Sequence, residues 1–163
     1  MFIEILIGGS LVRILIAFGM VVVTVIIHAI GFHLLLRTMI RAHALAVSGI
    51  RHVGLWLIGI TFSLMLIHLV EISVWGLFYF WQGCLPDVET AFYFSGITYT
   101  TVGYGDIVLP KQWRLLAPIE ALTATLLFGL STGLFFTVVY RWIINWVQRQ
   151  TVLDRDSASP KNK

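Results

Sequence analysis

Three long apolar stretches, separated by short polar segments, dominate the hydrophobic pattern of the chain. The first lies within residues 1–36, where a lead-in of ten residues precedes Leu11–Leu36, and the second is Val53–Trp81. Each exceeds the roughly 20 residues that a helix needs to cross a bilayer. The third, Trp113–Val147, is about 50 Å long at the rise of an α-helix, so it must tilt or extend beyond the membrane. The pattern predicts an all-α membrane protein with three transmembrane helices.

A shorter helix is predicted between the second and third stretches, over residues 88–100. Asp87 is a suitable N-cap, and Glu89 in the first turn complements the positive end of the helix dipole. The helix would be about 20 Å long. This is too short to cross a bilayer but suits a re-entrant helix, after which the chain returns to the side that it left. The second and third spans are therefore expected to be antiparallel.

The segment after this helix, Thr101-Val102-Gly103-Tyr104-Gly105-Asp106, contains two glycines at alternate positions. Because Gly103 and Gly105 lack a Cβ, alternate residues can take positive φ and successive carbonyls can point to one side. The Thr101 hydroxyl can extend the line of oxygens. Carbonyl dipoles in such a line can replace the water that a cation loses in a narrow pore. An ordinary glycine turn is the alternative interpretation.

This motif resembles the selectivity filter of potassium channels. The resemblance implies an ion path along residues 101–105, with K⁺ bound at Thr101, Val102, Gly103 and Tyr104. The side chains of Val102 and Tyr104 would point away from the ion. Because one strip of carbonyls cannot surround an ion and the motif occurs once in the chain, the resemblance also implies a homotetramer in membrane lipid.

The resemblance also assigns supporting roles around the filter. Tyr93 is expected to donate a hydrogen bond to Asp106, Phe94 to pack on Tyr104, and Thr100 to support the filter. The third span would be the inner helix that lines the cavity. Small residues there permit either close helix packing or a gating hinge, and the candidate hinge residues are Gly129 and Gly133.

Ionisable side chains inside the predicted spans need protein partners, because charge in hydrocarbon is costly. His68 and Glu71 are three residues apart and share one helical face. We expect this pair, and Glu120 in the third span, to brace the pore from behind. A proton-sensitive gate is the alternative, and currents that do not change across about pH 5 to 8 would exclude it. His28 and His33 are expected to be hydrogen-bonded or interface histidines, and a metal-binding or proton-relay role is the alternative.

Composition and charge define the setting of these elements. The chain has 58% apolar and 12% charged residues, unlike a soluble domain. Its net charge of +3 comes from basic ends and loops, so it indicates membrane topology and no nucleic-acid partner. The basic loop 37–52 and the tail share one side with Arg141, which predicts a cytoplasmic C-terminus, an outside N-terminus and a location in the cell membrane. Eight basic residues lie on that side, against three on the other: Arg37, Arg41, Arg51, Arg141, Arg149, Arg155, Lys161 and Lys163, against Arg13, Lys111 and Arg114.

The remaining residues narrow the class of function. Residues 148–163 are polar and predict a disordered cytoplasmic tail, which is too short to fold as a sensor domain. The lone Cys84 excludes an intrachain disulfide. Histidines and carboxylates are scattered with no triad or metal-ligand spacing, so we expect no enzyme and no cofactor, only permeant K⁺. The predicted function is passive, potassium-selective conduction. A non-selective cation pore and a non-conducting membrane scaffold or channel subunit are the alternatives.

Overall fold

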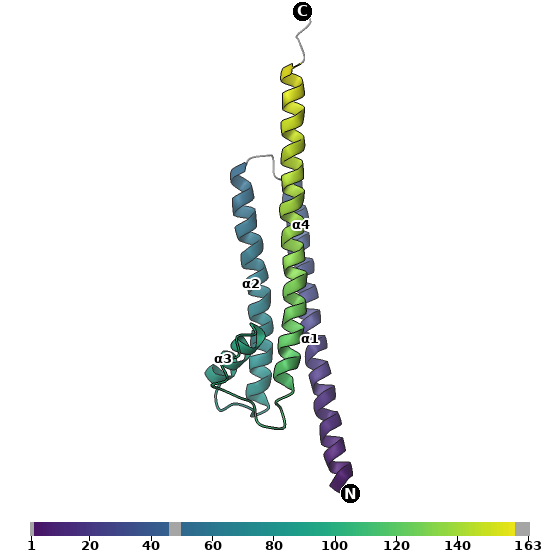
Figure 1. Ribbon diagram of the computed structural model, residues 1–163, viewed down its shortest axis with the longest axis vertical. Helices are drawn as coiled ribbons and strands as arrows, with labels where there is room; N and C mark the ends of the chain where they lie inside the picture. The colour runs from purple at the N-terminus through teal and green to yellow at the C-terminus, as the bar shows by residue number, and fades with distance from the viewer. Residues whose placement is uncertain (1, 46–49, 159–163) are drawn as a thin grey trace, which may run out of the picture. The chain divides into compact units, whose positions relative to one another are not determined.

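The computed structural model describes the backbone of residues 2–45 and 50–158 (Figure 1). These residues form four helices and no strand: α1 (Phe2–Leu45), α2 (Ile50–Trp81), α3 (Val88–Tyr99) and α4 (Leu116–Ala158). Three of the helices contain segments long and apolar enough to cross a membrane, namely Leu11–Arg41, Gly54–Trp81 and Leu116–Gln148. The predicted all-α fold with three spans and one short helix is confirmed.

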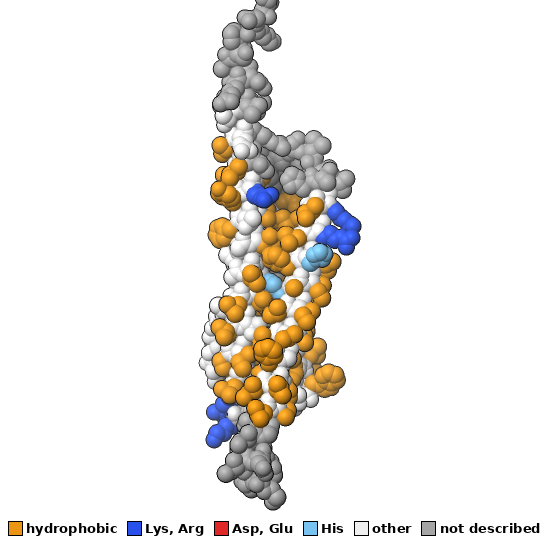
Figure 2. Space-filling view, turned by 90° about the vertical axis from the view of Figure 1, so that its right-hand side faces the viewer, with side chains coloured by type: hydrophobic (Ala, Val, Ile, Leu, Met, Phe, Trp, Pro, Cys, Tyr) orange, Lys and Arg blue, Asp and Glu red, His pale blue; other side chains and the backbone are white. Residues whose placement is uncertain are grey.

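The outer surfaces of these helices are largely apolar. On α1 alone, exposed large apolar side chains recur from Leu11 to Ile40, and Figure 2 shows how widely apolar side chains cover one face of the molecule. A helix that is apolar on nearly all sides belongs in lipid or against other protein, because water would not solvate it. The exposed apolar surface therefore agrees with membrane insertion.

The chain divides into two compact units, Met1–Phe128 and Gly129–Lys163. The first contains α1, α2, α3 and the beginning of α4, and its core is rich in aromatic residues. Trp75, Tyr79 and Tyr99 are fully buried in this core. The second unit consists of the remainder of α4, so the predicted inner helix continues through both units.

Close packing and polar contacts join α1 to α2. A Cβ at Gly31 would lie 2.7 Å from a side-chain carbon of Ile67, so only glycine permits this approach without a shift of Ile67. Towards the other end of α2, the indole N–H of Trp75 donates a 2.9 Å hydrogen bond to the Thr24 hydroxyl. This bond satisfies the one polar atom of a fully buried tryptophan.

Helix boundaries differ from the prediction at the polar segments. We expected a lead-in over residues 1–10 and a basic loop or surface helix over 37–52, but α1 begins at Phe2 and continues to Leu45. The prediction of a disordered tail is wrong for residues 148–158, because α4 continues to Ala158. Residues 37–45 and 148–158 contain no glycine or proline, so each prolongs an existing helix without a new nucleation step. Residues 46–49 and 159–163 lie outside the described residues.

The predicted N-cap of α3 is present. An Asp87 carboxylate oxygen accepts a 2.8 Å hydrogen bond from the Thr90 backbone N–H, and the other accepts one from the Thr90 hydroxyl at 2.8 Å. These hydrogen bonds to Thr90 lower the pKa of Asp87 because they stabilise the ionised carboxylate. The cap fixes the start of the helix that precedes the 101–106 segment.

We expect Asp87→Ala to destabilise α3 and to speed hydrogen exchange of its first-turn amides. Because folding lowers the pKa of Asp87, ionised Asp87 stabilises the folded state. This stabilisation is fully present above the pKa in the unfolded state, about 3.9, and is lost as pH falls through the pKa in the folded state. The difference in melting temperature between wild type and Asp87→Ala should therefore shrink below about pH 4. Asp87→Asn, an uncharged cap, is the control and should lack this acid dependence. A difference that persists in acid would contradict the prediction.

Candidate functional site

The backbone of the 101–106 segment alternates between left-handed and ordinary conformations. Thr101, Gly103 and Gly105 have φ values of 61°, 51° and 77°, whereas Val102 and Tyr104 are not in this region. The positive φ expected at both glycines is present. Thr101 was not expected to adopt it, because its branched Cβ makes this conformation unfavourable. Alternation of this kind lets successive carbonyls face the same side, in place of the alternating sides of a regular strand.

The last turn of α3 holds the beginning of this segment. The Thr101 N–H donates to the carbonyl of Thr98 and the Gly103 N–H to that of Ile97, both at 3.0 Å. Thr100, predicted as a support, is the C-cap of α3, and its hydroxyl donates to the Gly96 carbonyl at 2.7 Å. These bonds satisfy carbonyls that the helix end leaves free and fix the unusual conformation at Thr101.

A side-chain hydrogen bond holds the other end of the segment. The Tyr93 hydroxyl donates to a carboxylate oxygen of Asp106 at 2.8 Å, as the sequence predicted. This bond raises the pKa of Tyr93, because the hydroxyl proton is held by the carboxylate. Since Tyr93 belongs to α3, the helix contacts both ends of the 101–106 segment.

Phe94 lies elsewhere than predicted. Its ring is buried and meets Tyr79 of α2 edge-on, with 5.3 Å between ring centroids. Tyr104 is 73% exposed. The predicted packing of Phe94 on Tyr104 is therefore wrong within one chain. Phe94 lies in the contact between α3 and α2, where edge-to-face aromatic packing is favourable, while Tyr104 and Val102 remain uncovered.

Glu120 braces α3 from behind, as predicted. One of its oxygens accepts a 2.6 Å hydrogen bond from the Tyr79 hydroxyl, and the other lies 2.6 Å from the Ser95 hydroxyl. Glu120, Tyr79 and Ser95 are all fully buried. The cluster joins α2, α3 and the beginning of α4. Sequence reasoning identified Glu120 but missed both partners.

The Ser95 hydroxyl lies within hydrogen-bond distance of two acceptors, and a neutral Glu120 would satisfy both contacts. The Ser95 oxygen is also 2.9 Å from the backbone carbonyl of Ile72, which can only accept a hydrogen bond. A hydroxyl has one hydrogen and can donate fully to one of these two oxygens. If Ser95 donates to Ile72, the contact with Glu120 requires a protonated carboxyl group that donates to Ser95. All the contacts are satisfied with Glu120 neutral.

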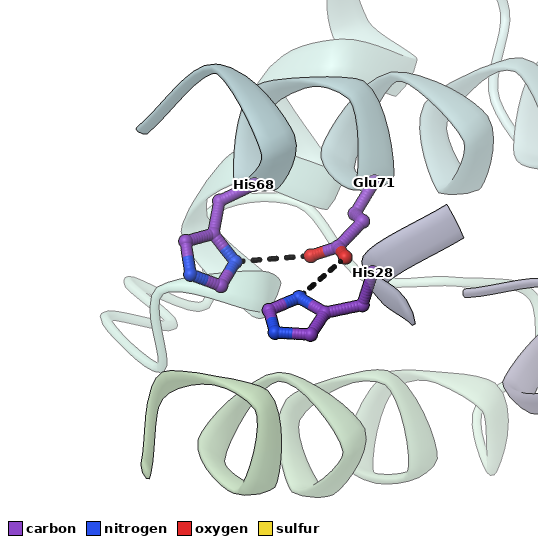
Figure 3. Close-up of side chains that lie close together, drawn as sticks. All are labelled: His28, His68 and Glu71. Carbon is purple, nitrogen blue, oxygen red and sulfur yellow. Dashed lines mark hydrogen bonds and ion pairs between the residues drawn. The ribbon is translucent and has the colours of Figure 1, made fainter. Parts of the chain in front are cut away.

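Glu71 is the centre of a second brace, which includes α1 (Figure 3). His28 Nδ1 lies 2.9 Å from one oxygen of Glu71, and His68 Nδ1 lies 2.9 Å from the other. The hydroxyl of Tyr99, the last residue of α3, also donates to Glu71. His28, His68 and Glu71 therefore have the protein partners that their position in the spans requires. The proton-sensitive alternative for His68, Glu71 and Glu120 stays a prediction.

The candidate hinge glycines lie inside continuous helix. α4 is helical through Gly129 and Gly133, and an added Cβ at either position would meet no atom of the described chain within 4 Å. Their role as a hinge stays a prediction.

Residues 65–141 match a family of proteins described as ion channels. The match includes Glu71, α3, the 101–106 segment and Glu120, and it excludes α1. Together with the three apolar helices, it supports a passive ion channel in a multi-pass membrane protein. Searches of curated proteins and of solved structures returned no match.

Proposed function

We propose that the chain forms a potassium-selective channel in which the 101–105 segments of four copies surround a common axis. The observation that carries this proposal is positive φ at Thr101, Gly103 and Gly105, every second residue of the segment. Carbonyl oxygens aligned in this way are neutral dipoles. They can replace the hydration shell of K⁺ without the full counter-charge that would trap the ion.

Exposure of the segment supports assembly. Val102 is 51% exposed and Tyr104 73% exposed, although both are large apolar side chains next to a well-packed core. One chain supplies a single strip of carbonyls, which cannot enclose an ion. A closed ring of identical copies would supply the missing sides of the path and cover the apolar side chains.

The charges around the segment favour a cation. α3 ends at Tyr99, next to the segment, so the negative end of its dipole lies near the beginning of the ion path. Residues 101–105 contain no charged side chain. Asp106 follows at the other end, where its carboxylate can attract cations to the mouth. Together these features provide attraction without a tight binding site.

The basic residues support an orientation with the N-terminus outside and the C-terminus in the cytoplasm. The Arg13 guanidinium, near the beginning of the first span, donates to the backbone carbonyl of Gln112, just before α4. By the order of the spans along the sequence, three basic residues fall on this side and eight on the opposite side, and basic residues accumulate on the cytoplasmic side. The 101–106 segment would then face the outside of the cell membrane.

Ion flux into proteoliposomes tests the proposal. We expect the reconstituted protein to pass K⁺ at least about 100-fold faster than Na⁺, which corresponds to a difference in barrier of about 2.8 kcal/mol. Equal fluxes would establish a non-selective cation pore. A folded protein that passes neither ion would be a scaffold or a non-conducting subunit.

Native mass spectrometry of the detergent-solubilised protein tests the assembly. We expect a mass of four chains. A monomer, or an assembly without an axis that the 101–105 segments can surround, would contradict the proposed ion path even if the membrane preparation leaked K⁺.

A further inference from the structure

Two histidines and a glutamate from two different helices converge (Figure 3), next to Tyr99 at the end of α3. His28 comes from α1, and His68 and Glu71 come from successive turns of α2. They are 3%, 9% and 0% exposed. One potential ligand atom from each residue lies within 4.8 Å of the other two. From these contacts we propose that His28, His68 and Glu71 form a binding site for a divalent transition-metal ion of the Zn²⁺ class.

The donor set suits such an ion. Zn²⁺ prefers imidazole nitrogen and carboxylate oxygen, and two histidines with one glutamate form a known three-ligand arrangement that leaves a fourth position open. An alkali or alkaline-earth ion would need more oxygen ligands than this cluster provides. The oxygen of Tyr99, which lies 3.1 Å from His68 Nδ1, is a candidate for the fourth ligand.

The three side chains are already close to one another. Each histidine Nδ1 lies 2.9 Å from a different oxygen of Glu71, and one ligand atom from each residue lies within 4.8 Å of the other two. Ligand atoms about 2.05 Å from a tetrahedral Zn²⁺ lie about 3.3 Å from each other. Binding therefore requires the side chains to rotate so that the two nitrogens and one carboxylate oxygen face a common point.

The second ring nitrogen of His28 can carry the imidazole hydrogen, because no described residue holds that atom in a hydrogen bond. Metal binding through Nδ1 requires its lone pair, so the ring hydrogen must be on Nε2. In the structure the buried Nε2 of His28 has no hydrogen-bond partner among the described residues. The ring is also held by stacking on Phe32, and His68 packs against Phe128 with 4.6 Å between centroids. These ring contacts restrict the orientations of both imidazoles.

A metal ion bound at this site would link two helices. α1 supplies one ligand and α2 supplies the other two, so a bound ion would join these helices directly. Glu71 also accepts the hydrogen bond from Tyr99 at the end of α3. The site therefore lies next to the helix that precedes the 101–106 segment. α1 lies outside the region that matches ion channels. Supplying His28 as a metal ligand would give this helix a role that the family match does not assign.

Co²⁺ is the probe, because tetrahedral Co²⁺ absorbs visible light where Zn²⁺ does not. The full chain in detergent is expected to bind one Co²⁺ per chain with a tetrahedral visible spectrum, and Zn²⁺ should displace it. His28→Gln should weaken binding about 100-fold or more, since removing even an outer partner of a metal site costs 10- to 100-fold. A glutamine amide can still donate a hydrogen bond to Glu71, so this variant is expected to fold.

His33→Ala is the matched control. His33 is five residues after His28 on the same helix and is exposed, so its loss should leave Co²⁺ binding unchanged. Zn²⁺ at about 100 times its dissociation constant should raise the melting temperature by about 5–10 °C in wild type and His33→Ala, but not in His28→Gln. Absence of a tetrahedral spectrum, or equal binding by His28→Gln, would overturn the site. Neither measurement depends on ion flux, so the proposed conduction is tested separately.

Discussion

Gly103→Ala is expected to abolish K⁺ flux while the protein remains folded and assembled. Gly103 has a φ of 51°, and an added Cβ would meet no described atom within 4 Å. The effect of alanine is therefore on the backbone itself. An L-residue in the left-handed conformation is less favourable than glycine by about 1–2 kcal/mol, and this is repeated in every chain of a ring. Relaxation of φ would turn carbonyl oxygens away from the ion path.

Gly83→Ala is the matched control for this variant. Gly83 lies in the turn after α2 and has a φ of 63°, and an added Cβ there would likewise meet no described atom within 4 Å. Alanine at this position imposes the same kind of backbone strain outside the proposed ion path. We expect Gly83→Ala to conduct and Gly103→Ala to be silent in the same flux assay, with equal amounts of assembled protein by native mass spectrometry. Wild-type flux from Gly103→Ala would contradict the proposed path.

Local features of the site could be predicted from the sequence because they depend on neighbouring residues. The positive φ at Gly103 and Gly105 follows from the missing Cβ, and the cap at Asp87 follows from the residue type before a helix. The bond from Tyr93 to Asp106 was found by resemblance. In each case the partners are separated by at most 13 residues. Their geometry is set by one helix and the segment that follows it.

Contacts between helices could not be predicted in the same way. Helices that are apolar on nearly all sides do not reveal which face meets which neighbour. Glu71 and Glu120 were identified because buried carboxyl groups need partners, but the partners His28 and Tyr79 are 43 and 41 residues away. The sequence signal at His28 was its position inside an apolar span, which indicates that the side chain needs a protein partner but not which one. Its pairing with Glu71 depends on the packing of α1 on α2, which the sequence does not specify.

The two carboxyl groups show how packing changes the chemistry of the same residue type. Glu71 accepts from the Tyr99 hydroxyl and contacts the Nδ1 atoms of His28 and His68, which donate to it when they carry the ring hydrogen; this arrangement suits an ionised carboxylate. Glu120 accepts from Tyr79 but faces a Ser95 hydroxyl that also contacts the Ile72 carbonyl. A neutral Glu120 satisfies all of these groups. The amide of glutamine has the same pattern, with one acceptor and one donor end.

We therefore expect Glu120→Gln to fold and conduct nearly as wild type, with a loss of stability within about 1 kcal/mol. Glu120→Ala should cost about 3–5 kcal/mol, because it leaves a cavity and removes partners from two buried hydroxyls. This corresponds to a melting temperature lower by about 6–20 °C. Thermal unfolding of the two variants in the same detergent measures the difference.

Glu89 provides the control, because it is an exposed carboxylate in the first turn of α3. Glu89→Ala and Glu89→Gln should differ little from each other, since water solvates the position in either case. If Glu120→Gln instead destabilises as much as Glu120→Ala, the site requires a negative charge and Glu120 is not neutral. Infrared difference spectra provide a direct check: the carbonyl stretch of a protonated carboxyl group should be present in wild type and absent in Glu120→Gln. This result would establish that a neutral acid joins α2, α3 and α4 behind the proposed ion path.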